Sequence, residues 1–184
     1  MTFPFNLRKT IQAVGVVLDA DDRRVMDYVR LLKLLYIADR EAILETGRPI
    51  IGSKVVALKN GPLHSRVYNL IKGEDVAKAE WAQFFRTKHY YICRTGEPGV
   101  DTLSRYEIRK LREVEQRFQD CDTWQLVEST HEFPEWKKNY PDPSENTSRV
   151  SPLEDVIEAV GCSTDVAAIL QDAEEAEAID RLLG

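Results

Sequence analysis

Cysteine is scarce in this chain. Its three cysteines are widely spaced and odd in number: Cys93, Cys121 and Cys162. A disulfide framework uses an even, dense set of cysteines, and a zinc site uses close pairs such as CxxC. We therefore expect three reduced, mostly buried thiols and no disulfide-stabilised fold.

Histidine and the common catalytic motifs are equally sparse. None of the three histidines, His64, His89 and His131, has a histidine partner at i, i+4 or stands in an HExxH motif. The sequence also lacks GxSxG, GxxxxGK[ST] and GxGxxG. These absences predict no metal, no cofactor and no enzymatic activity.

Long apolar runs are missing as well. No stretch approaches the roughly 20 apolar residues that span a bilayer. The N-terminus "MTFPFNLRKTIQ" lacks the long apolar stretch and the small-residue cleavage site of a secretion signal. We expect a cytoplasmic protein without a membrane partner.

Basic residues are rare in the last third of the chain. Residues 121–184 hold four Lys and Arg against fifteen Asp and Glu, whereas the two preceding thirds carry net charges of +3 and +2. This distribution argues against nucleic acid as the main partner of the C-terminal part, and we expect no nucleic-acid partner. It leaves two interpretations open: a solvated acidic helix, or a surface for a basic protein partner.

The chain has enough apolar material for one compact domain, since 43% of its 184 residues are hydrophobic. Apolar spacing predicts a mainly α fold, a compact helical domain with one small antiparallel β-sheet. We expect helices over residues 6–18, 26–46, 63–73, 77–86, 104–119, 123–133, 151–161 and 163–183. The sheet is predicted to pair residues 53–60 with residues 89–94, whose β-branched and aromatic side chains suit strands.

The helix over residues 26–46 has apolar positions too dense for a thin stripe, which predicts a central helix with neighbours on several sides. Gly47 suits the left-handed position after it, and Pro49 prevents the helix from continuing. Gly61 and Pro62 indicate a turn.

Two S-x-x-E sequences predict capping boxes at helix starts: Ser104 to Glu107, and Ser151 to Glu154. Pro134 is expected to stop a helix. The Pro-, Ser- and Asn-rich residues 140–152 are expected to form a loop.

Asp39 stands inside the apolar run of the long helix. Residues three and four positions away are apolar or amphipathic, so its carboxylate is predicted to face inward. A buried carboxylate needs a partner, and the candidates are Arg48 and the turn amides near Gly52 or Gly61. One interpretation is a structural Asp that ties the turn to the helix.

The alternative interpretation is a catalytic Asp39 that acts with Arg48 and His64.

Lys33 and Arg40 lie seven residues apart, on the side of the helix that is predicted to be more exposed. They are candidates for contacts with a partner.

Several short motifs occur together over residues 31–68: "KLLYIAD", "GRPIIG", "ALKNGP" and then a helix with Tyr68. As a set they resemble the Panacea domain of SocA-like antitoxins, a family that includes phage-associated GepA-like proteins. The later segments "LSRYEIRKLREVEQRF" and "STHEFPEWKK" also resemble the family. The chain departs from the pattern at Leu63, where a β-branched residue is usual.

The resemblance implies an antitoxin that neutralises a cognate protein toxin, encoded nearby, by direct binding. A proteolytic adaptor that delivers a toxin or other cargo to a protease is an alternative. We predict a Panacea-like domain over residues 1–160 and an acidic helical extension over residues 161–184, packed on or beside it.

The candidate partner-binding residues are Lys33, Tyr36, Arg40, Arg48, His64, Tyr68 and Trp136. The residues expected to maintain the structure of the motif are Asp39, Gly47, Pro49, Gly52, Gly61, Pro62, Thr130 and His131.

Overall fold

The structure is a computed structural model that describes residues 2–20, 22–140, 148–161 and 166–183. Its helices are α1 (Leu7–Leu18), α2 (Tyr28–Thr46), α3 (Ser65–Lys72), α4 (Lys78–Trp81), α5 (Arg105–Arg117), α6 (Thr123–His131), α7 (Pro134–Asn139), α8 (Leu153–Ala159) and α9 (Val166–Leu183). Its strands are β1 (Val25–Asp27), β2 (Val55–Leu58), β3 (Gly61–His64), β4 (Phe85–Lys88), β5 (Tyr91–Arg94) and β6 (Arg149–Ser151). No helix in the described part of the chain is long and apolar enough to cross a membrane.

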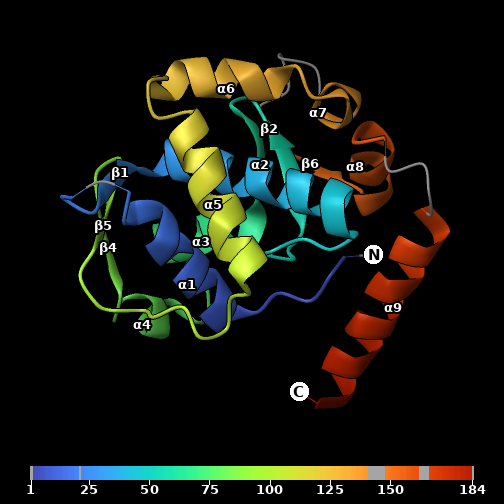
Figure 1. The fold of residues 1–184 in the computed structure, drawn as a ribbon, viewed down its shortest axis with the longest axis horizontal. Coiled ribbons are helices and arrows are strands. Elements are labelled where there is room, and N and C mark those ends of the chain that lie inside the picture. The colour runs from blue at the N-terminus through green and yellow to red at the C-terminus, as the bar shows by residue number, and fades with distance from the viewer. Residues whose placement is uncertain (1, 21, 141–147, 162–165, 184) are drawn as a thin grey trace.

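Helix α2 runs through the middle of the molecule, with other elements around it (Figure 1). Asp27 caps its N-terminus by accepting hydrogen bonds from the backbone N–H groups of Val29 and Arg30. Gly47 ends it in a left-handed conformation, with φ of 74°, and donates its N–H to the carbonyl of Ile43. The predicted central helix and its end at Gly47 are both confirmed.

The strands form two small antiparallel sheets instead of the single sheet predicted. One has the order β3–β2–β6 and the other the order β1–β5–β4. The predicted pairing of residues 53–60 with residues 89–94 is wrong, because β2 pairs with β3 and β5 pairs with β4. Such hairpins close a short loop and lose less chain entropy than a pairing between distant segments. Gly61 and Pro62 accordingly belong to β3 and are not the turn itself.

Of the two predicted capping boxes, one is present in the structure and the other is not. Ser104 and Glu107 form the expected capping box of α5. Ser151 caps nothing, since it is the last residue of β6, and α8 begins after Pro152 without a side-chain cap. Pro134 begins α7 instead of stopping a helix, because proline fits the first helical position, where its missing N–H has no intrahelical partner.

Other sequence expectations also need correction. The helix predicted over residues 77–86 is shortened to α4, and the aromatic residues that follow lead into strand β4. Part of the predicted loop over residues 140–152 is strand β6, while residues 141–147 lie outside the described residues. Cys93 and Cys121 are free thiols, as expected, but both are half-buried; Cys162 lies outside the described residues.

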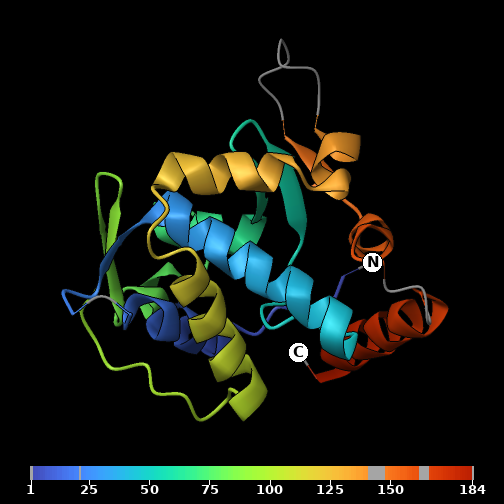
Figure 2. The same ribbon diagram turned by 45° about the horizontal axis from the view of Figure 1, so that its top comes forward.

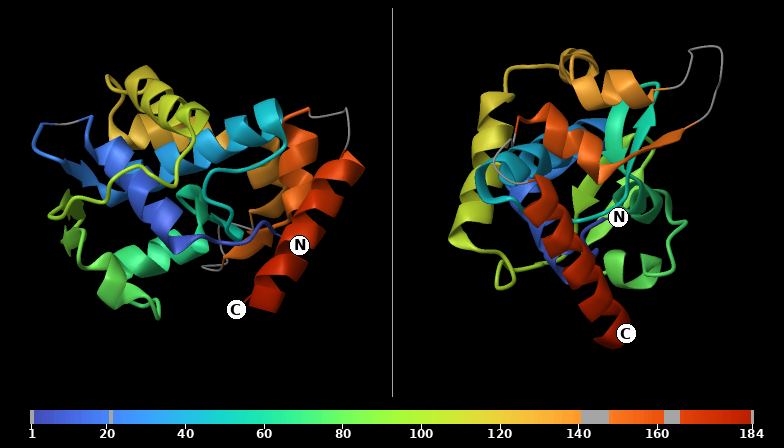
Figure 3. Two further views of the ribbon diagram at one scale, coloured as in Figure 1. Left: turned by 60° about the horizontal axis from the view of Figure 1, so that its bottom comes forward. Right: turned by 90° about the vertical axis from the view of Figure 1, so that its right-hand side faces the viewer.

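The C-terminal helices are joined to the rest of the fold by a second, smaller apolar cluster. It combines Phe3, Ile43 of α2, three residues of α8, and Ile169 and Ala173 of α9. Helix α9 runs along the outside of the body, next to the end of α2 (Figures 1 and 3). Its packed stripe includes Ile169 and Leu170.

Candidate functional site

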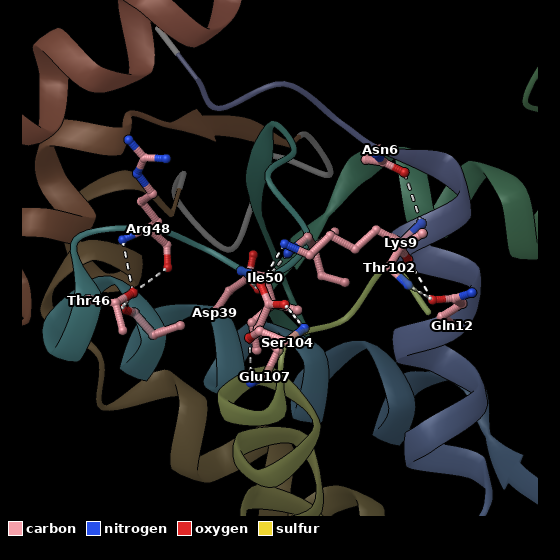
Figure 4. Close-up of polar contacts among 12 residues, drawn as sticks. Asn6, Lys9, Gln12, Asp39, Thr46, Arg48, Ile50, Thr102, Ser104 and Glu107 are labelled. Carbon is pink, nitrogen blue, oxygen red and sulfur yellow. Dashed lines mark hydrogen bonds and ion pairs between the residues drawn. The ribbon is translucent and has the colours of Figure 1, made fainter. Parts of the chain in front are cut away.

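Asp39 holds the turn that follows α2. Its side chain is buried and faces inward, as the phase of the helix predicted. Its Oδ1 accepts hydrogen bonds from the backbone N–H groups of Ile50 and Ile51, each at 2.9 Å (Figure 4). Because these amides lie beyond the end of the helix, they have no helical acceptor. Asp39 therefore ties the turn to the helix.

His64, at the end of β3, lies beside this carboxylate, with its Nε2 3.3 Å from Oδ2 of Asp39. Burial raises the pKa of Asp39, against the effects of His64 and the turn amides. Burial lowers the pKa of His64 below its ordinary value of 6.5, although Asp39 opposes that shift. This direction favours the uncharged imidazole at pH 7.

Arg48 is not the partner of Asp39, which corrects one prediction. Its side chain is 68% exposed and pairs with Asp172 of α9 at 2.8 Å. Figure 4 shows the Arg48 side chain pointing away from Asp39. The left-handed residue Gly47 turns the backbone at this point, so that the amides after Arg48, and not its guanidinium, reach the carboxylate. The alternative catalytic group is thus not assembled, since only Asp39 and His64 come together.

Lys33 is buried, with 1% of its surface exposed, although the sequence placed it on the more exposed side. Its Nζ donates a hydrogen bond to the carbonyl of Pro62 at 2.7 Å. Burial lowers the pKa of this ammonium from 10.5 to about 7. A Cβ added at Gly61 would collide with Oγ1 of Thr130 and lie 3.1 Å from Lys33 Nζ, which explains why glycine stands there.

Arg40 is also less exposed than predicted, because it packs against α7. Its Nε donates a hydrogen bond at 2.8 Å to Oε1 of Glu135, and the phenol of Tyr36 donates to the same oxygen at 2.8 Å. The Arg40 guanidinium also lies over the ring of Phe133, 4.3 Å from its centre. Burial, and then the Glu135 carboxylate, raise the pKa of Tyr36 well above its ordinary value.

Glu135 is not among the residues predicted from the sequence, although its side chain is fully buried. Its position offers no clear signal, since an acidic residue in the first turn of a short helix is normally a favourable partner of the helix dipole. We call the following set the polar centre: Lys33, Tyr36, Asp39, Arg40, His64 and Glu135.

Residues 31–137 match the family described as the antitoxin SocA-like, Panacea domain. The chain belongs to this family. No curated protein and no solved structure matches the chain. The whole polar centre lies within the residues that match the Panacea family.

Four further candidate residues from the Panacea motif lie outside the polar centre: Tyr68, Trp136, Thr130 and His131. Tyr68 is half-buried against the main core. Trp136 is also half-buried, donates its Nε1–H to the carbonyl of Leu58 at 2.9 Å, and stacks on His131 at 4.2 Å between ring centres. Thr130 is fully buried and donates its hydroxyl to Val127. The Trp136 hydrogen bond fastens α7 to strand β2, and its stacking on His131 joins α7 to α6.

A small cavity of about 30 Å³ lies next to Asp39 and His64. Pro49 and Gly52 of the motif line it, and Phe3 and Leu153, from outside the matched residues, help to enclose it. Pockets for small-molecule ligands are roughly 300–1,000 Å³, so this cavity has room for about one water molecule. Among the described residues, no cluster of three His, Cys, Asp or Glu side chains could hold a metal ion.

Proposed function

We propose that this chain is an antitoxin that neutralises a cognate protein toxin by direct binding, without catalysing a reaction. Its membership of the SocA-like Panacea family carries the proposal. The geometry of the polar centre favours a structural role for it over a catalytic one, because its charged groups are engaged with the turn, with β3 and with α7. The cavity beside Asp39 is far smaller than a ligand pocket.

Burial limits which predicted residues can touch a partner. Lys33, Tyr36 and His64 are each at most 2% exposed, so a toxin reaches them only if the fold opens. Arg48 is exposed, and Trp136 and Tyr68 are half-buried. A direct partner role for Lys33, Tyr36 and His64 remains a prediction. In the folded chain these three side chains contact other residues of the same chain.

Expression of the neighbouring open reading frame tests this proposal. We expect that protein to stop growth when it is expressed alone, and co-expression of the present chain to restore growth. The two proteins should co-purify as a complex. A neighbour that is harmless alone and does not bind this chain would contradict the antitoxin function.

A proteolytic adaptor is the second candidate, and helix α9 is the observation that favours it. Helix α9 lies outside the matched residues and exposes two apolar side chains near its end, Ile179 at 56% and Leu182 at 85%. An adaptor needs one surface for its cargo and another for the protease, and this end of α9 is available for the second.

The adaptor role can be tested without removing α9 from the fold. An Ile179→Asp/Leu182→Asp variant leaves the packed residues Ile169 and Ala173 in place. We expect this variant to bind the toxin normally but to slow its degradation in cells. An unchanged toxin half-life would exclude this surface of α9 as the protease contact.

A further inference from the structure

The β4–β5 hairpin brings exposed aromatic and basic side chains together. Tyr90 and Tyr91 are 66% and 55% exposed, and Arg86 and Lys88 are exposed beside them. Figure 2 shows the hairpin standing clear of the helical body. Tyrosine and arginine are enriched at the energetic centres of protein interfaces. This combination makes the hairpin a candidate contact surface.

The strand register places most of these side chains on one face. Lys88 is paired with Tyr91 and Arg86 with Cys93, and residues directly opposite each other in an antiparallel pair share a face. The other face carries Phe85 and Ile92, which are 1% and 0% exposed. The inward face therefore holds the hairpin on the body, and the outward face is basic and aromatic.

A groove of about 710 Å³ continues from the outward face, beside Tyr91 and strand β1. Two ionisable residues that line this groove, Asp27 and Arg30, are already bound to other groups of the chain. Asp27 caps α2, and the Arg30 guanidinium donates hydrogen bonds to the carbonyls of Phe118 and Cys121. In contrast, the described part of the chain gives the side chains of Arg86 and Lys88 no hydrogen bond or ion pair.

Strand β4 is an edge strand, with β5 as its one strand partner among the described residues. Its other side offers backbone N–H and C=O groups to an incoming strand. The positive charges of Arg86 and Lys88 oppose pairing with the same edge of a second copy. They attract an extended segment that carries carboxylates.

The tip of the hairpin is held in position before any partner binds. The carbonyl of Tyr90 accepts the backbone N–H of Tyr28 at 2.9 Å, which ties the tip to the start of α2. His89, the first residue of the two-residue turn, has φ of 55° in the left-handed region that favours glycine. A preorganised surface loses less conformational entropy on binding.

We propose that the β4–β5 hairpin is the toxin-binding surface. An extended, acidic segment of the toxin pairs with the free edge of β4, its carboxylates meet Arg86 and Lys88, and its apolar side chains pack on Tyr90 and Tyr91. This inference rests on the proposed antitoxin function.

A charge reversal with a matched control tests the surface. The hairpin variant is Arg86→Glu/Lys88→Glu. The control is Arg105→Glu/Arg112→Glu on α5, which changes the net charge equally at two other exposed positions. We expect the hairpin variant to bind the purified toxin about 100-fold more weakly, because it sets like charges against each other. The control should stay within about twofold, measured by titration calorimetry on variants whose folding is checked by circular dichroism.

Amide hydrogen exchange on the wild-type complex tests the strand pairing itself. The amides of β4 should become protected when the toxin binds. A folded hairpin variant with unchanged affinity, a control that loses as much affinity, or unprotected β4 amides would each overturn this surface while leaving the antitoxin function intact. A wild-type chain that binds no neighbour-encoded protein would overturn both.

Discussion

The polar centre and the β4–β5 hairpin use similar side chains in opposite ways. In the polar centre, Tyr36 and Arg40 share a buried carboxylate. In the hairpin, Tyr90, Arg86 and Lys88 face solvent. The difference comes from position, since α2 is packed on several sides and β4 lies at the edge of a sheet. The comparison separates charges that are buried and engaged within the Panacea fold from charges that are available to a partner.

Glu135→Ala should have the largest effect. It leaves the Arg40 charge and the Tyr36 hydroxyl without their shared acceptor in a buried site, which costs about 3–5 kcal/mol of unfolding free energy. Urea denaturation measures this loss. Glu132→Ala is the control, because Glu132 is exposed and its ion pair among the described residues is with exposed Lys137, so it should lower the unfolding free energy far less. Equal losses of unfolding free energy for Glu135→Ala and Glu132→Ala would mean that burial of a carboxylate does not decide how much it stabilises the fold.

Asp39→Ala should have the second-largest effect and lower the unfolding free energy by about 3 kcal/mol. The reason is that the buried amides of Ile50 and Ile51 each lose a hydrogen-bond acceptor, which costs about 1–3 kcal/mol. Asp39→Asn retains an amide oxygen and should cost clearly less in the same denaturation experiment. A folded Asp39→Asn protein that still protects cells from the toxin would also exclude a catalytic Asp39. Complete loss of protection at normal stability would favour the catalytic alternative.

Lys33→Met should stabilise the protein at pH 7 by about 2 kcal/mol, since it removes a buried ammonium that has no buried counter-charge among the described residues. Between a folded pKa of about 7 and an unfolded pKa of 10.5, the unfolded wild-type chain binds more protons, so its stability rises with pH. The variant should lack this rise. Unfolding free energies of both proteins from pH 6 to about 10.5 measure the difference, and parallel curves would contradict the assignment.

His89→Gly, in the turn of the hairpin, should raise the unfolding free energy by a smaller amount. It relieves about 1–2 kcal/mol of left-handed strain but adds about 0.5–1 kcal/mol of unfolded-chain entropy. The melting temperature should therefore rise slightly, by the equivalent of about 0.5–1 kcal/mol. His89→Ala, which retains the strained backbone without the ring, is the matched control and should show no gain.

Arg86→Ala/Lys88→Ala should change stability least, within about 0.5 kcal/mol, because both side chains are exposed and free of described ion pairs. The same variant should weaken toxin binding. A large loss of stability with unchanged binding would reverse the contrast between the hairpin and the polar centre. Thermal melting and calorimetric titration on one preparation distinguish these outcomes.

Local sequence determined more of this protein than its scarcity of motifs suggests. Apolar periodicity and the Gly47 signal located α2 and its end, and the helix phase placed Asp39 inward. The spaced motifs over residues 31–68 identified the Panacea family, which the match over residues 31–137 confirms. These features depend on neighbours within one or two turns of the chain, and such neighbours are visible in the sequence.

Only the tertiary structure decided which groups meet. The phase of α2 predicted Lys33 on the more exposed side of the helix. In the structure that side is covered as well, so Lys33 is buried. The dense apolar run around Lys33 was a signal for this burial. Glu135 reaches Tyr36 across 99 residues of chain, and β2 pairs with β6 from far along the sequence. Periodicity describes an element relative to its own axis, whereas these contacts depend on how separate elements pack.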